Sequence, residues 1–101
     1  MDEIVRVFEE GRDLLTDHVL EQMLERDINV SDLRSAITAD DPEIIEDYPD
    51  DDPLPSCLII CTGAGGTTYH VVCSRPPDVW VITAYEPDTI RWSPDRRRRL
   101  L

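Results

Sequence analysis

Apolar positions in the first third of the chain follow a helical period. Between residues 2 and 27 they recur at steps of three or four, as on one face of a helix. They are Ile4, Phe8, Leu15, Val19 and Met23. Gly11 interrupts the pattern, so we expect two helices or one interrupted helix. Thr16 is a suitable N-cap for the second helix, and a short third helix is expected from Ser31 through Ile37.

The second half of the chain has the pattern of a sheet. Residues 57–62, 67–74 and 79–85 are β-prone runs separated by turns, which predicts a meander of three strands. Residues 43–48 can add a short edge strand. The run at 57–62 is apolar on both faces, so we expect it in mid-sheet with both faces covered. Helices followed by strands predict an α+β domain, with two or three helices packed on an antiparallel sheet of three or four strands.

Charge is distributed unevenly along the 101 residues, a length that suits one domain. The chain has 22 acidic and 10 basic residues, a net charge of −12, and every basic residue is arginine. Residues 1–55 carry −14 and the remainder +2, with four consecutive arginines at 96–99. Two interpretations of the acidity stay open: solvated helix faces that keep the protein soluble, or a docking surface for a basic partner.

Cysteine usage and apolar runs bear on location and on metal binding. Three cysteines, with no hydrophobic leader after Met1, favour the cytoplasm over a secreted disulfide scaffold. The longest apolar run, at residues 57–61, is too short to cross a membrane. Cys57 and Cys61 would lie roughly 13 Å apart along a strand, too far to share one zinc ion. We therefore expect buried thiols, no metal site and no cofactor.

Several short motifs resemble a family of small bacterial domains of unknown function. Residues 18–28, HVLEQMLERDI, resemble its HAxxRMxERGI signature, and VITAYEPD at 81–88 followed by Trp92 resembles its final strand. The short helix at 31–37 and the segments at 42–48 and 70–72 fit the same order. The resemblance covers roughly residues 16–92. Residues 1–15 are then an N-terminal helical extension and residues 93–101 an arginine-rich tail of the same single domain.

The resemblance carries expectations about fold and activity. That family is similar to RelE-like and MqsR-like messenger-RNA interferases, and its genes often neighbour MqsA-type antitoxins. A RelE-like fold, RNA cleavage and a small antitoxin partner are what the resemblance implies. Gln22 replaces an arginine of the signature and Asp27 a glycine, which weakens phosphate binding. The acidic composition also counts against an active nuclease, because RNA is a polyanion.

Four residues are candidates for metal-free RNA cleavage, which needs a base, an acid and a cation. His18 and Arg26 lie on one stripe of the second helix, with His18 as base or acid and Arg26 as the phosphate clamp. Each also has a structural interpretation, namely a half-exposed histidine at the border of the core and an arginine paired with a carboxylate. His70 lies in a strand, either accessible on a helix-free face or buried and neutral on the core face. Tyr85 can supply a phenol, or pack with its hydroxyl in water.

The arginines near the C-terminus are candidates for substrate binding. Arg91, Arg96 and Arg97 can contact phosphate, although arginines without interleaved aromatic residues carry no base-reading information. The run can instead bind an acidic partner or fold back on the acidic helices. Trp92 beside it suits a core plug or lid.

Two functions follow from these observations. The first is a toxin-like domain of a toxin–antitoxin system that acts as a metal-independent endoribonuclease. The second is a non-catalytic module with the same fold that docks a protein through its acidic helices. RNA and a small protein are the expected partners, and no membrane is expected.

Overall fold

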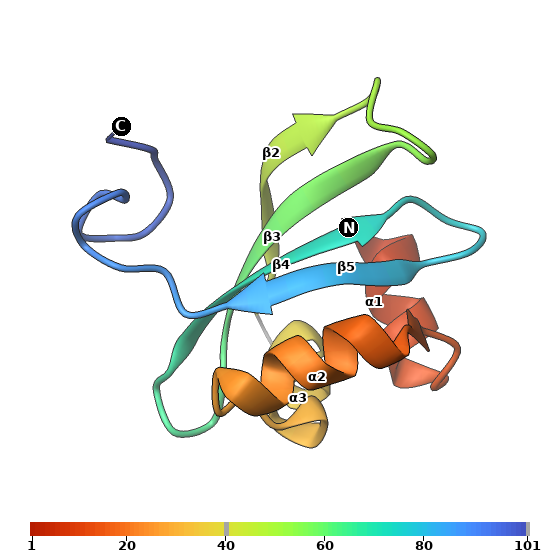
Figure 1. The fold of residues 1–101 in the computed structure, drawn as a ribbon, viewed down its shortest axis with the longest axis horizontal. Coiled ribbons are helices and arrows are strands. Elements are labelled where there is room, and N and C mark those ends of the chain that lie inside the picture. Colours follow the sequence, from red (N-terminus) through yellow and green to blue (C-terminus); the bar gives the residue numbers. More distant parts are fainter. Residues whose placement is uncertain (40, 101) are drawn as a thin grey trace.

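Three helices pack on one face of a five-stranded sheet (Figure 1). This computed structural model describes residues 1–39 and 41–100. The helices are α1 (Asp2–Glu9), α2 (Asp17–Glu25) and α3 (Val30–Ile37). The strands are β1 (Leu14–Leu15), β2 (Glu43–Tyr48), β3 (Ser56–Thr62), β4 (Thr68–Ser74) and β5 (Trp80–Tyr85). The α+β class expected from the sequence is confirmed.

The sheet is larger than predicted and is mixed. Its strand order is β1-β5-β4-β3-β2, in which β2 to β5 pair antiparallel and β1 pairs parallel to β5. The expectation of three or four antiparallel strands is therefore wrong. Leu14 and Leu15 form the missed strand. Two residues are too few to show strand alternation, and Leu15 also fits the helical stripe of its neighbours.

The helix boundaries follow local capping chemistry. α1 ends at Glu9, and Gly11 takes a φ of +68°, a left-handed conformation that suits glycine. The Thr16 hydroxyl accepts a hydrogen bond of 3.1 Å from the Val19 amide, as predicted for an N-cap. α3 begins one residue earlier than expected because Asn29 caps it, by accepting from the Ser31 amide at 2.8 Å.

The main core lies between the helices and the sheet. Ile4, Val19 and Leu33 of the three helices meet Ile59 and Val71 of the central strands, and all five are buried. β3 lies between β2 and β4, and its first six residues are buried. The prediction of a mid-sheet strand covered on both faces is thus confirmed. The three cysteines are free, buried thiols, as expected.

The other face of the sheet carries no helix, and the chain covers part of it after β5. We call residues 86–100 the C-terminal arm and this face the helix-free face. The arm lies on the side of the sheet away from α1 and α3 (Figure 1). It folds on itself through an antiparallel bridge between Trp92 and Arg99, with the Leu100 amide donating to the Arg91 carbonyl at 2.7 Å. Trp92 is buried, so its predicted role as a plug or lid is confirmed.

No helix within residues 1–39 and 41–100 has the length and apolar character needed to cross a membrane. The same residues contain no cluster of three or more histidine, cysteine or acidic side chains placed to hold a metal ion.

Candidate functional site on the helix-free face

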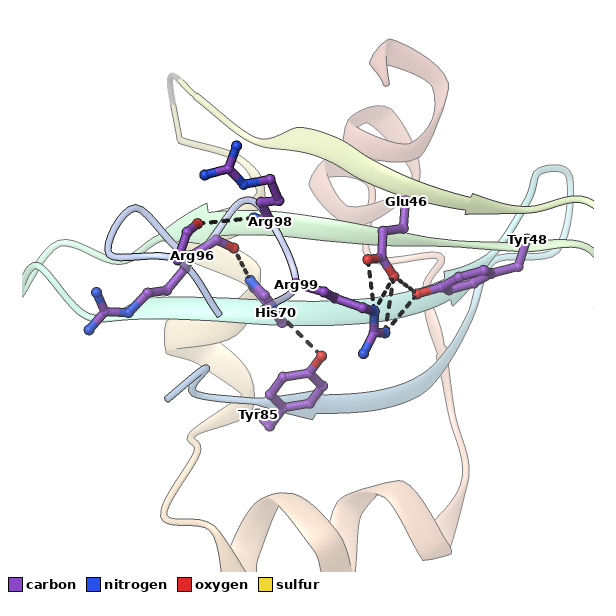
Figure 2. Close-up of polar contacts among 8 residues, drawn as sticks. Glu46, Tyr48, His70, Tyr85, Arg96, Arg98 and Arg99 are labelled. Carbon is purple, nitrogen blue, oxygen red and sulfur yellow. Dashed lines mark hydrogen bonds and ion pairs between the residues drawn. The ribbon is translucent and has the colours of Figure 1, made fainter. Parts of the chain in front are cut away.

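His70 lies near the middle of the helix-free face (Figure 2). It pairs with Ile60 of β3 and Tyr85 of β5, and it alternates with Val71, which belongs to the main core. The sequence left His70 either accessible on a helix-free face or buried on the core face. The structure combines the two alternatives: the ring is on the helix-free face, yet it is 0% exposed because the arm covers it.

Both ring nitrogens of His70 have hydrogen-bond partners. The Arg96 carbonyl oxygen lies 2.7 Å from Nε2, and because a carbonyl only accepts, Nε2 carries the proton. Nδ1 then accepts from the Tyr85 hydroxyl at 3.3 Å. Burial lowers the pKa of His70, and the hydrogen bond to Arg96 only partly opposes this effect. The imidazole is therefore neutral at neutral pH while the arm covers it.

Aromatic rings and a guanidinium pack around this imidazole. The Trp92 ring meets His70 edge to face, with centroids 4.3 Å apart, and Tyr85 does so at 5.3 Å. The Arg99 guanidinium lies 4.7 Å from the centroid of Trp92, a cation–π distance. Burial raises the pKa of Tyr85, so its phenol stays protonated and its O–H donates a hydrogen bond to Nδ1 of His70.

Glu46 completes the cluster from β2. Arg99 donates to both carboxylate oxygens of Glu46, with Nε at 2.8 Å from Oε2 and Nη2 at 3.0 Å from Oε1. The Tyr48 hydroxyl also donates to this carboxylate (Figure 2). Partial burial of Glu46 raises its pKa, but the hydrogen bonds from Arg99 and Tyr48 outweigh burial and hold the pKa below its usual value. Glu46 is therefore an ionised carboxylate on the same face as His70.

The arginines predicted to bind substrate have different environments. Arg97 pairs with Glu43 of β2 at 3.0 Å, and Arg96 contributes its carbonyl to His70. Arg91 is exposed. The arginine run does fold back on acidic residues of its own chain, but these lie on β2 and not on the helices.

The stripe on α2 forms a second polar group at the edge of the sheet. His18 is exposed, and the Gln22 amide donates to its Nε2 at 3.0 Å. Arg26 donates to the Thr83 hydroxyl at 3.0 Å and to the Ala84 carbonyl at 2.9 Å. The expected pairing of Arg26 with a carboxylate is wrong, because its guanidinium bonds Thr83 and Ala84 of β5.

Two of the four predicted catalytic residues, His70 and Tyr85, are in direct contact near the end of β5. Arg26 bonds the Ala84 carbonyl, and the next residue, Tyr85, bonds His70. His18 is joined to this group only through Gln22, whose side-chain oxygen accepts from Thr83 at 3.4 Å. The exposed pair on α2, His18 and Arg26, thus lies on one side of β5, and the covered pair, His70 and Tyr85, lies on the other.

Comparison with protein families matches residues 15–86 to a domain of unknown function, DUF4258. The chain belongs to this family. The expectation of a small family of unknown function is thereby confirmed. No curated protein and no solved structure gave a significant match.

The DUF4258 match includes the catalytic candidates but not the C-terminal arm that covers His70. His18, Arg26, His70 and Tyr85 all lie inside the matched range. The match ends at Glu86, where the arm begins, so Trp92 and the arginine run lie outside it. The groups able to do chemistry thus belong to the DUF4258 core, whereas the segment that buries His70 does not.

Glu46 is the site residue that sequence reasoning missed. Glu43 and Glu46 are three positions apart, and regular alternation would place them on opposite faces of a strand. A shift in register between Ile44 and Glu46 leaves both glutamates facing the arm, opposite Ile60 and Leu58. The available signal was charge complementarity between this strand and the arginine run.

Proposed function

We propose that this DUF4258 protein is a toxin-like, metal-independent endoribonuclease whose catalytic groups lie on the helix-free face and are held closed by the C-terminal arm. One observation carries the proposal. An imidazole, a phenol, a carboxylate and a bidentate guanidinium gather on one face, from His70, Tyr85, Glu46 and Arg99. These side-chain types supply the base, acid and cation that cleavage through a 2′-hydroxyl requires.

Each group has a role that its chemistry permits. Glu46 takes the proton of the 2′-hydroxyl, and a protonated His70 returns one to the leaving 5′-oxygen. Arg26 and the arginines of the arm bind the phosphate oxygens, on which negative charge grows in the transition state. Tyr85 orients His70 through its hydrogen bond. His18 lies beyond β5, where it can contact a neighbouring phosphate.

The closed arrangement opposes this chemistry in two ways. His70 is covered and neutral, so it can neither meet RNA nor donate a proton. Glu46 is engaged by Arg99, which lowers its basicity. Displacement of the arm removes both restraints at once and frees Arg97 and Arg99 from their ion pairs for phosphate contacts. The proposed enzyme is therefore active when the arm is open and quiet when it is closed.

The test is to open the arm without altering a catalytic group. Glu43→Arg replaces the Arg97 ion pair with repulsion, and Glu9→Arg makes the same charge change on α1. We expect Glu43→Arg to cleave a fluorogenic RNA oligonucleotide in the presence of a chelator about 5-fold faster than wild type, the factor that about 1 kcal/mol of arm opening gives. Glu9→Arg controls for the gain in RNA affinity that any such charge change gives, and its cleavage rate should match that of wild type.

A second set of variants assigns the catalytic group. In the Glu43→Arg background, His70→Asn should lower the cleavage rate at least about 100-fold, the usual contribution of a general acid. His18→Asn should lower it less. If neither wild type nor Glu43→Arg cuts RNA, and neither slows bacterial growth when induced, the nuclease proposal fails.

A different observation favours the second candidate function, a non-catalytic protein-binding module. Leu20 and Leu24 lie one turn apart on α2, 40% and 79% exposed, beside the carboxylates of Glu21 and Glu25. An apolar pair within an acidic surface suits a basic protein partner, such as an antitoxin. This candidate predicts a stable complex that weakens with salt and with Leu24→Ser, and no RNA cleavage by any variant.

A further inference from the structure

The arm covers only part of the helix-free face. His70, Val72 and Ser74 are alternate residues of β4 and face this side in succession. The arm lies over His70, but Val72 lines an open hollow of about 520 Å³ and Ser74 lines a second hollow of about 430 Å³. Asp51 lines both hollows, so they adjoin. We call the two together the open groove.

Apolar side chains from two parts of the chain line the larger share of the second hollow. Trp80 and Ile82 come from β5, and Leu54 comes from the loop before β3. They are 37%, 44% and 41% exposed, which is unusual for side chains of this size gathered in one place. Ile82 pairs with no residue of β4, because the register between β4 and β5 shifts between Val72 and Cys73. At this bulge the side chain of Ile82 lines the second hollow.

Carboxylates stand along one rim of the open groove. Asp50, Asp51 and Asp52 come from the loop between β2 and β3, and all three are exposed. Within residues 1–39 and 41–100 none of them forms an ion pair. Asp51 accepts a hydrogen bond of 2.6 Å from the Ser56 hydroxyl, which fixes the loop beside the sheet. The rim thus adds unneutralised negative charge next to an apolar floor.

The arm shows which chemistry this face accepts. At its own end of the face, an apolar ring, Trp92, packs on the sheet while the neighbouring guanidinium of Arg99 binds the carboxylate of Glu46. The open groove also has an apolar floor and an acidic rim, but no arginine is among the described residues that line its two hollows. RNA does not suit it, since the rim repels phosphate.

We propose that the open groove binds an extended peptide segment of another protein in which bulky apolar residues alternate with arginine or lysine. The apolar side chains enter the hollow between Trp80, Ile82 and Leu54, and the cations pair with the aspartate rim. This interaction surface differs from the acidic helices and does not depend on RNA cleavage.

The test uses a defined probe, the acetylated and amidated peptide Arg-Leu-Arg-Ile-Arg, titrated into the isotope-labelled full chain. We expect amide shifts at Trp80, Ile82 and the 50–54 loop. Affinity should fall at least about 10-fold, or about 1.4 kcal/mol, for Ile82→Ser and for a peptide with glutamine in place of arginine. It should also fall as salt rises from about 0.05 M to about 0.5 M. Ile90→Ser is the matched control, because Ile90 is an exposed isoleucine of the arm and does not line the groove.

Three results would overturn the inference. One is the absence of binding at a peptide concentration of about 1 mM, the weak end of specific recognition. Another is equal binding by wild type and Ile82→Ser, or shifts confined to α2. The third is a concentration-dependent dimer of wild type that Ile82→Ser abolishes, which would assign the groove to a second copy of this chain. Asp50→Asn with Asp52→Asn keeps the test informative if Ile82→Ser does not fold.

Discussion

The two faces of the sheet are covered in different ways. On the helix-covered face, aliphatic side chains such as Ile59 and Val71 are sealed by residues from all three helices. On the helix-free face, the cover is one irregular segment held by Trp92, by the hydrogen bond that His70 donates to the Arg96 carbonyl and by ion pairs to Glu43 and Glu46. The first cover depends on apolar burial alone, whereas the second combines one buried aromatic ring with ion pairs and a histidine hydrogen bond.

This difference separates global unfolding of the domain from local opening of the arm. Apolar burial depends little on salt or pH, whereas exposed ion pairs contribute only about 0–1 kcal/mol each and are screened by salt. A segment held in this way opens locally at a smaller free energy than global unfolding requires. The comparison predicts that the arm can leave while the helix-covered core stays folded.

The largest effect is expected in the helix-covered core. Ile59→Ala removes a fully buried side chain from the middle of the sheet and should lower the free energy of unfolding by about 2–5 kcal/mol. Ile90→Ala, at an exposed isoleucine of the arm, should change it by less than about 0.5 kcal/mol. Urea denaturation of both variants measures the difference. If both variants lowered the free energy of unfolding equally, the helices and the arm would not differ in how much they stabilise the fold.

A smaller global effect is expected from the main anchor of the arm. Trp92→Ala removes the ring that packs on His70, so the arm should detach and its amides should exchange rapidly. The free energy of unfolding should fall by about 1–2 kcal/mol, because the core strands remain packed without the arm. Trp80→Ala, at the exposed tryptophan of the same face, is the control. Loss of protection throughout β3 and β4 would mean that arm and core form one cooperative unit.

Acid should open the arm by a moderate amount. Burial lowers the pKa of His70, so the closed state favours the neutral ring. Closure is complete above the ordinary histidine value of about 6.5 and weakens as pH falls through the lowered value, because the open state binds the proton more readily. Around this ring, Glu46 attracts the added proton, whereas Arg99 opposes it and Tyr85 stays neutral.

The readout is amide exchange of the arm between about pH 7.5 and about pH 5, the range in which histidine titrates. The ratio of arm exchange to core exchange corrects for the intrinsic pH dependence and should rise several-fold for wild type. His18→Gln should leave that rise unchanged, because the hydrogen-bond partner of His18 is Gln22 of α2 and not a residue of the arm. A rise that persists in His70→Gln would assign the pH response to another group.

The sequence was a good guide to the parts of the fold that local chemistry determines. Helix breaks at Gly11, the Thr16 cap and the mid-sheet position of β3 all follow from residue type and apolar pattern, and all are confirmed. β1 was missed because two residues carry no periodicity, and its parallel pairing with β5 depends on contacts across 66 positions, from Leu14 to Trp80.

The candidate site was predictable in its members and not in its arrangement. Arg26, His70 and Tyr85 were selected as residue types suited to the chemistry. His70 and Tyr85 are in contact near the end of β5, and Arg26 bonds the backbone one residue earlier. No local signal places a bulge in β2, so the joint facing of Glu43 and Glu46 could not be anticipated. The covering of His70 likewise depends on a tertiary contact that begins only after β5 ends.

The smallest expected effect, that of one ion pair, also shows most directly how the two covers differ. Arg97→Ala removes a pair whose side chains are 45% and 55% exposed, so arm closure should weaken by only about 0.2–1 kcal/mol. Arg12→Ala is a matched control, since Arg12 pairs with Glu10 at similar exposure away from the arm. Raising salt from about 0.05 M to about 1 M should also weaken closure of the arm, because salt screens the same ion pair.

Salt should act in the opposite direction on the whole domain. A net charge of −12 destabilises a compact chain of this length by self-repulsion, and screening relieves it. We therefore expect the thermal midpoint to rise with salt while amide exchange of the arm, relative to that of the core, becomes faster. Arg97→Ala should reduce the salt response of the arm and leave that of the midpoint nearly unchanged. If salt instead slowed arm exchange along with raising the midpoint, apolar contact of Trp92 and not charge would hold the arm closed.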